Sequence, residues 1–319
     1  MTILIASSSL DEESWRSVEQ DLLRRGLDVL VYEADRVASG SVDLTYTVSN
    51  DNSLNMVYNG RQINLESIQA AWFRRPTMFS GELADKSRQL SLDTERRLLQ
   101  YPIWEAVPCR AWLSEPRKIS HAENKIIQLS VAREVGFRIP MTVVSNDWQS
   151  IESLLPSSVV FKPSYGTLYT NDGIRLLYTT PLTNSPSGLP KSGNPFPGLW
   201  QPFLEKLKEW RVTVVGDDFF AAAIYTDADA KDDWRRHQLS TSKVRFAVER
   251  LPAAVESACR RYLERLQLGF GAFDLVESPD GHITFLECNA NGQFGWLEDE
   301  LGLPISRAIA DQLSQLTGA

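Results

Sequence analysis

The sequence predicts an α/β (α+β) protein that begins with an open α/β domain. The first residues give an apolar run at 3–6, an amphipathic stretch, and a second apolar run, "DVLVYE", at 28–33. Strand, helix and strand in this order form a βαβ unit. Later segments alternate between apolar and polar residues on either side of turn signals, as antiparallel hairpins do. A chain of 319 residues is long enough for two or three subdomains.

Composition and charge narrow the class of protein. Hydrophobic residues make up 43% and charged residues 23% of the chain, as in soluble globular proteins. The formal charge is −8, from 33 basic and 41 acidic residues, so we expect no nucleic-acid partner. Neither a long apolar segment nor a signal sequence is present, so we expect a cytoplasmic protein with no membrane partner. Three widely spaced cysteines suit a reducing compartment.

The first helix is expected between the two apolar runs. "SSSLDEE" offers capping residues and first-turn acids, and Trp15, Val18 and Leu22 recur at helical spacing before Gly26 ends the helix. No glycine-rich phosphate loop follows the first strand, so a dinucleotide site is not indicated there.

Residues 43–70 read as a hairpin around the Asn59-Gly60 turn signal. The next strand, "AAWFRRP", ends in Arg74 and Arg75. Two arginines at a strand end form either an anion clamp or a solvated edge, and the local sequence fits both. Residues 82–106 are expected to be helical.

The middle of the chain predicts a helix and strand, then a further strand and a loop. The helix contains Asn124 and Lys125 and is closed by Gly136. "SSVVFKPSYGT" gives a strand with Lys162 at its end. Residues 181–198 are dense in Pro, Gly, Ser and Asn, a composition typical of a long surface loop.

The most informative stretch is "GFGAFDLVESPDGHITFLECNANGQFGWLE", which predicts a hairpin turning at 279–281. Antiparallel pairing about that turn places Asp274 near Glu287, and Asn289 shares a face with Glu287 because side chains alternate along a strand. Three oxygen ligands without histidine or thiolate suit Mg²⁺. The alternative is that the two acids merely edge a sheet.

Three basic residues have a functional interpretation only if a metal site lies beside them. Lys125 and Lys162 could each be a surface lysine, or the pair could neutralise triphosphate oxygens. Arg211, in "WRVTVVG", could bind phosphate or carboxylate through two hydrogen bonds, or form an ion pair with Glu205 or Glu209.

The ordered set of motifs resembles an ATP-grasp ligase. The set runs through Lys125, "VFKP", "WQPFLEK", "WRVTVVG", Asp274 and "LECNANGQ". Within that superfamily, "FRRP", "FLEKLKEWRVTVVGDDFFAAAI", "DDWR" and "NGQFGWLE" are similar to the maturases of graspetides, the microviridin-type ligases that cross-link side chains of ribosomally made peptides. The resemblance implies an N-terminal pre-ATP-grasp domain at 1–115, a central subdomain at 116–198 that acts as a lid and could contact a leader peptide, and a C-terminal subdomain at 199–319 with the metal site; the last two sandwich ATP.

The resemblance also implies roles for the charged residues. Lys125 and Lys162 would contact the ATP phosphates, and Lys162 and Arg211 would act in catalysis on the transferred phosphate or acyl phosphate. The metal ligands would bind two Mg²⁺ ions; they are Asp274, Glu287 and Asn289.

The hinge strand implied by the family is the stretch around "WQPFLE". Gln201, Phe203 and Leu204 would present the backbone that reads adenine, and Glu205 would hold the ribose hydroxyls. Pro202 departs from the family pattern and removes one backbone donor, so neighbouring residues would have to supply the adenine contacts.

The implied reaction joins side chains of one peptide. ATP converts an Asp or Glu carboxylate of a ribosomal precursor peptide, with a leader and an acidic core, into an acyl phosphate; a Ser, Thr or Lys side chain then forms an ester or amide. Peptide contacts are expected from Arg74, Arg75, Asp233, Trp234 and Arg235, although the acidic run at 227–233 equally fits a solvated loop. Whether the chain forms a homodimer stays open.

Two rival functions remain at this stage. One is an ATP-grasp ligase that joins two separate molecules, such as an amino acid and a peptide end. The other is a nucleotide-binding scaffold without ligase activity, which the complete set of phosphate and metal residues argues against. Trp296, just beyond the expected metal ligands, either packs beside the metal loop or belongs to the core.

Overall fold

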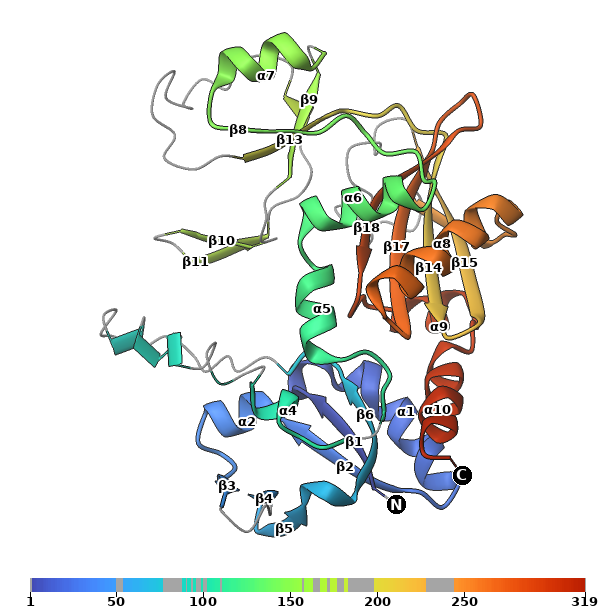
Figure 1. The fold of residues 1–319 in the computed structure, drawn as a ribbon. Helices are drawn as coiled ribbons and strands as arrows, with labels where there is room; N and C mark the ends of the chain where they lie inside the picture. Colours follow the sequence, from blue (N-terminus) through green and yellow to red (C-terminus); the bar gives the residue numbers. More distant parts are fainter. Residues whose placement is uncertain are drawn as a thin grey trace.

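The computed structural model describes residues 2–49, 54–76, 88–89, 91–92, 94–95, 99, 102–109, 111–156, 158–162, 167–170, 173–176, 181–182, 198–227 and 244–318. Figure 1 shows the N-terminal part at the bottom, the middle of the chain at the top, and the C-terminal sheet on the right. The last helix, α10 (Ile305–Leu316), returns to pack against α1 (Glu12–Arg24) of the N-terminal part. No helix within the described ranges is long and apolar enough to cross a membrane.

The N-terminal part is built on a four-stranded parallel sheet in the order β2-β1-β6-β7. Its strands are β1 (Thr2–Ser7), β2 (Asp28–Glu33), β6 (Ile68–Phe73) and β7 (Ala111–Trp112). The short helical segments around it are η1 (Ser9–Asp11), α2 (Ala34–Ala38), η2 (Leu65–Ser67) and α4 (Pro102–Glu105). The predicted βαβ unit is confirmed. Within 82–106, the described residues at 88–89, 91–92, 94–95, 99 and in α4 are helical, as expected, and Ala106 forms a turn; the others lie outside the description.

A small antiparallel sheet covers one end of this part and contains the predicted hairpin. Its strands are β3 (Leu44–Val48), β4 (Leu54–Tyr58) and β5 (Arg61–Asn64). Asn59 and Gly60 both adopt positive φ, 51° and 74°, in the turn between β4 and β5. Such a turn matches the right-handed twist of the flanking strands, so the two-residue signal was read correctly.

The middle of the chain contains a break that the sequence did not predict. Instead of one helix there are two, α5 (Pro116–Ala122) and α6 (Lys125–Glu134). Asn124 lies between them, and its side chain accepts hydrogen bonds from the N–H groups of Ile126 and Ile127. The expectation that Asn124 sits inside a helix is therefore wrong: it is the N-cap that starts a new helix.

A four-stranded antiparallel sheet follows, in the order β12-β9-β13-β8. Its elements are β8 (Val143–Ser145), α7 (Trp148–Leu154), β9 (Val159–Lys162), β12 (Pro181–Leu182) and β13 (Gly198–Pro202). A separate hairpin is formed by β10 (Thr167–Thr170) and β11 (Gly173–Leu176). Of the predicted loop 181–198, the ends belong to β12 and β13, and 183–197 lie outside the described residues.

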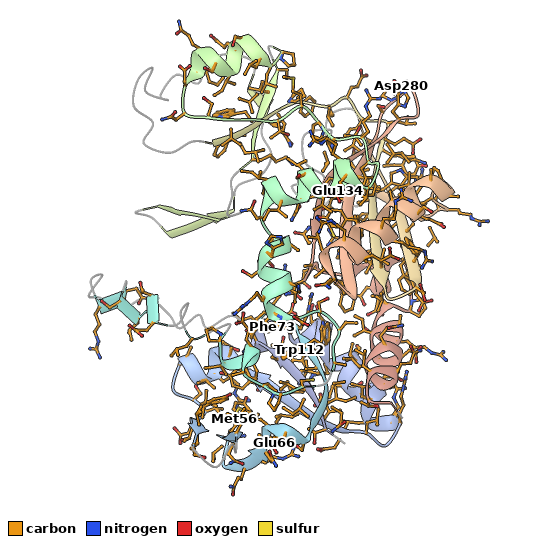
Figure 2. The ribbon with its side chains drawn as sticks, in the orientation of Figure 1. Met56, Glu66, Phe73, Trp112, Glu134 and Asp280 are labelled. Carbon is orange, nitrogen blue, oxygen red and sulfur yellow. The ribbon has the colours of Figure 1, made fainter. Side chains whose placement is uncertain are left out.

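The C-terminal part is a five-stranded antiparallel sheet in the order β16-β15-β14-β17-β18. Its strands are β14 (Lys208–Val215), β15 (Asp218–Thr226), β16 (Val244–Val248), β17 (Phe270–Glu277) and β18 (Ile283–Asn289). Helices α6 and α8 (Ala253–Leu266) pack on one face. There Tyr262 of α8 and Phe137, which follows α6, form an aromatic cluster with Phe273 and Phe285 of the sheet. The short helix α9 (Gly295–Leu301) follows β18. Figure 2 places Asp280 at the tip of the β17–β18 hairpin and Glu134 at the end of α6.

Candidate active site

The β17–β18 hairpin brings the expected oxygen ligands together. Asp274 is the cross-strand partner of Glu287, next to a register shift between Asp274 and Leu275. The Nδ2 atom of Asn289 lies 3.4 Å from Oδ2 of Asp274. The predicted pairing is confirmed, and metal binding by these three residues stays a prediction. Among the described residues no group of three or more His, Cys, Asp or Glu side chains forms a metal site, so a metal here would rest on two carboxylates and one amide.

Each carboxylate of the pair contacts a cation. Lys125 Nζ, at the start of α6, lies 2.7 Å from Glu287 Oε2, and their side chains are 25% and 21% exposed. Arg211 Nη1, on β14, lies 2.8 Å from Asp274 Oδ1. Arg211 therefore forms an ion pair with Asp274, and not with Glu205 or Glu209 as the sequence suggested. Two acids and an arginine on neighbouring strands of one sheet, together with a lysine from α6, can neutralise and orient an anionic substrate.

The loop that contains Gly292 and Gln293 packs closely against β17 and Arg211. Arg211 is 8% exposed, and its Nη2 donates a 2.8 Å hydrogen bond to the carbonyl oxygen of Gln293. A Cβ at Gly292 would overlap the Cβ of Ala272 and come within 2.9 Å of Arg211 Nη2. A glycine is required here because any side chain would displace the loop. Arg211 Nε is buried without a hydrogen-bond partner in the described chain, as expected of a donor that awaits a ligand.

Arg74 does not lie where a peptide could contact it. The residue is fully buried, and its Nη1 donates to the carbonyl oxygens of Asn291 and Gly292 at 2.9 Å each. Its other nitrogens donate to Asp11, Ser14 and the Gln293 side chain. Burial lowers the pKa of Arg74 to about 10, against the opposing effect of Asp11. The expected peptide contact by Arg74 is wrong, because its donors fix the loop that holds Arg211.

Arg75 faces solvent and remains a candidate for peptide contact. Its φ of 49° is left-handed, and the residue is exposed whereas Arg74 is buried. Desolvation lowers its pKa and nearby Arg211 adds to this, while Asp11 and Glu123 oppose it. Desolvation raises the pKa of Glu123, and Arg75 counteracts that rise. Both residues are exposed yet partly desolvated, and Arg75 interacts electrostatically with Glu123 and with Arg211 of the candidate site.

Of the expected hinge residues, two make hydrogen bonds within the chain and two line a cavity. The Gln201 side chain is buried and donates to Thr142, and the Phe203 N–H donates to the Ser158 carbonyl at 3.0 Å. Leu204 and Glu205 instead line a cavity of about 480 Å³. Its other lining residues are Arg138, Ile139, Pro140, Met141, Pro202, Val276, Ser278, Pro279, Asp280 and Thr284. The Phe203 N–H is thus used within the chain, and of the expected hinge residues Leu204 and Glu205 line the cavity.

The structure describes only some of the remaining candidate site residues. Lys162 ends β9 half-buried, opposite Leu199 of β13. Trp296 packs against Phe246 with ring centroids 5.0 Å apart, which favours its assignment to the core. The expected peptide contacts at Asp233, Trp234 and Arg235 lie outside the described residues.

Sequence reasoning missed two residues that support the site. Gln293 receives hydrogen bonds from Ser14 and Arg74 at its side-chain oxygen and donates to Asp11, so it connects the N-terminal part to the loop after β18. Gln128 hydrogen-bonds the backbone of Cys288, between two of the expected metal ligands. The signal for Gln128 was its position one helical turn after Lys125; Gln293 had no local signal.

Comparison with known proteins identifies relatives along the whole chain. Residues 2–120 match the family model of the MvdD pre-ATP grasp domain. No curated protein matches the chain. A Chryseobacterium gregarium RiPP-associated ATP-grasp ligase, solved with ADP and a leader and core peptide, is 25% identical with a TM-score of 0.85, over 98% of this chain and 96% of that one.

Two proteins from Microcystis aeruginosa MRC are similar as well. The macrocyclase MdnC, bound with the precursor peptide MdnA, is 26% identical with a TM-score of 0.83 and covers 99% of both chains. The macrocyclase MdnB is 26% identical with a TM-score of 0.79 over 98% of both chains. The expected ATP-grasp fold is therefore confirmed.

Proposed function

We propose that this chain, an ATP-grasp ligase of the graspetide (microviridin-type) maturase family, closes rings within a ribosomally made precursor peptide. It is an ATP-dependent carboxylate ligase that activates Asp or Glu side chains and joins them to Ser or Thr as esters or to Lys as amides. The observation that carries this function is the convergence of Asp274, Glu287 and Asn289 beside Lys125 and Arg211.

The donor set fits Mg²⁺ and the phosphates of ATP. Two carboxylates and a carboxamide are hard oxygen ligands, and Asp274 and Glu287 are partly exposed, so positions remain for phosphate and water. Bound there, Mg²⁺ would neutralise phosphate charge, and we propose two such ions. Lys125 and Arg211, which now pair with these carboxylates, would then be available to phosphate oxygens.

The nucleotide base is proposed to occupy the cavity at the hinge. The cavity is lined mainly by apolar side chains, including Leu204, Met141 and Val276, and Glu205 is among its polar lining residues. An apolar pocket with a few polar groups is typical of small-molecule sites. Glu205 would accept hydrogen bonds from ribose hydroxyls, and Lys162 would contact the phosphates.

The reaction balances without an enzyme nucleophile. A carboxylate oxygen of the peptide attacks the γ-phosphorus, the bond to ADP breaks, and an acyl phosphate forms. The hydroxyl or amine of the acceptor side chain attacks the acyl carbon and loses its proton, and phosphate leaves with one former carboxylate oxygen. Arg211 and Lys162 stabilise the charge on the transferred group. Burial raises the pKa of the Cys288 thiol, the cysteine nearest the site, which disfavours a thiolate and a thioester route.

The partner is proposed to be a precursor peptide with a leader and an acidic core. The Chryseobacterium ligase was solved with a leader and core peptide and MdnC with its precursor. In this chain Arg75 would hold a core carboxylate that awaits activation, because it is the accessible arginine of the "FRRP" motif.

The test is a mass measurement coupled to nucleotide turnover. The purified chain is incubated with ATP, Mg²⁺ and a Thr- and Asp-rich peptide encoded beside its gene. Ring closure removes one water and releases one ADP per ring. An increase in peptide mass on addition of a free amino acid would instead indicate a ligase that joins two molecules. Nucleotide binding without ADP release in either case would indicate a scaffold.

A further inference from the structure

Strand β18, which carries two of the metal-site residues, is the outer strand of its sheet. An outer strand leaves alternate backbone N–H and C=O groups without a partner strand. At Cys288 a side chain replaces that strand: the N–H donates to Gln128 Oε1 at 3.1 Å, and the carbonyl accepts from Gln128 Nε2 at 3.0 Å. Gln128 is 3% exposed, so water does not compete for these bonds.

A carboxamide suits this position because it accepts and donates at the same time. A glutamate would only accept when ionised, a lysine would only donate, and an apolar side chain would leave both backbone groups of Cys288 unsatisfied at a buried place. The Nε2 atom of Gln128 also donates to the carbonyl oxygen of Ala122 at 2.8 Å. One amide thus connects the end of α5, the body of α6 and strand β18.

The residues on either side of this contact belong to the site. Cys288 lies between Glu287 and Asn289, whose side chains point to the opposite face from its own. Lys125 lies one helical turn before Gln128 on α6, and its Nζ is 2.7 Å from Glu287. Gln128 therefore constrains both the backbone that carries the ligands and the helix that carries the cation.

We propose that Gln128 is a positioning residue for the magnesium site, which fixes the orientation of Glu287 and Asn289 by holding the Cys288 backbone. The proposal rests on the proposed function of that site. Groups that orient metal ligands through hydrogen bonds typically change metal affinity or activity about 10–100-fold when they are removed.

Two variants separate positioning from simple stability. Gln128→Met keeps the length and the apolar stem of the side chain but makes neither hydrogen bond to Cys288. Val131→Ala is the matched control: it truncates another buried residue of α6 that has no polar group to offer β18. Both should lower the temperature of unfolding, because each loses buried interactions.

The three cysteines provide a readout that does not depend on turnover. Isotopic labelling of cysteine amides gives one NMR signal each for Cys109, Cys259 and Cys288, and Cys288→Ala identifies the third. Mg²⁺ is titrated into the protein with saturating ADP while the Cys288 amide is followed. In the wild type the signal should shift and saturate.

In Gln128→Met the Cys288 amide should already be displaced without metal, and its Mg²⁺ midpoint should rise about 10-fold or more. Val131→Ala should keep the wild-type midpoint. An unchanged midpoint in Gln128→Met would overturn the positioning role while leaving the metal site intact. Equal changes in both variants would also overturn it, because general destabilisation would explain them. If the wild-type signal did not respond to Mg²⁺, the metal assignment itself would fail, and the positioning role with it.

Discussion

Replacing Gly292 by alanine should inactivate the enzyme by displacing Arg211. The added methyl would overlap the Cβ of Ala272, lie 2.9 Å from Arg211 Nη2 and 3.2 Å from the Cβ of Asn289. Ala272 belongs to a central strand and cannot move aside, so the loop at 291–293 must shift outward. Carbon atoms in contact prefer a separation of about 3.5–4.0 Å, so the shift must be of the order of an ångström.

The displacement should affect both folding stability and the catalytic rate. Overpacking typically costs about 1–3 kcal/mol of folding stability, which a domain of ordinary stability survives. Loss of a donor that stabilises charge in the transition state lowers kcat about 10²–10³-fold, equivalent to ~3–4 kcal/mol. The effect on catalysis should therefore exceed the effect on stability, since Arg211 is held by the Gln293 carbonyl of the displaced loop.

The assay is ADP release with saturating ATP and precursor peptide, together with thermal unfolding. Gly295→Ala is the control, because nothing lies within 4 Å of a Cβ at that position in the same segment. Gly295→Ala should keep wild-type kcat. Adding Ala272→Gly to Gly292→Ala removes the worst overlap and should restore part of the lost rate. A folded Gly292→Ala enzyme with wild-type kcat would refute the role given to the loop and to Arg211.

Three further predictions concern single side chains. Glu287→Ala should raise the activation free energy of ring closure by ~3 kcal/mol or more, while the circular dichroism spectrum stays that of the wild type. Normal ADP release by this variant would argue against the metal assignment. Cys288→Ala should retain activity, and a folded but inactive variant would reopen a thioester route. Hydrogen bonding from Lys208 holds the pKa of Glu249 below its usual 4.5. Because the folded-state pKa is the lower one, Glu249 contributes stability above about pH 4.5 that is lost as the pH falls through the folded value. Urea unfolding across the acid range should show a smaller loss for Glu249→Gln, and equal losses would contradict this.

The sequence could predict what local geometry determines. A short turn fixes the pairing of β17 with β18, so the position of Asp274 opposite Glu287 followed from the spacing of the two residues about that turn. The turn at Asn59-Gly60 was equally local, because its residue types are those that accept positive φ.

A long-range contact accounts for one error of interpretation, and local helix capping accounts for the other. Arg74 looked like an exposed strand end, but its partners at 291–293 lie more than two hundred residues away, and no local pattern encodes their arrival. Asn124 looked like a helical residue because apolar periodicity continues across it, while its side chain satisfies the first N–H groups of α6. Capping competes with periodicity at such a position.

The most direct test of acyl-phosphate chemistry follows the oxygen atoms of the substrate. A precursor peptide whose Asp and Glu carboxylates carry heavy oxygen is cyclised with ATP and Mg²⁺, and the released inorganic phosphate is analysed by mass spectrometry. The proposed reaction predicts one heavy oxygen in phosphate for each ring formed and each ADP released, and no transfer by Glu287→Ala. Ring formation with unlabelled phosphate would contradict activation of the carboxylate by ATP at this site.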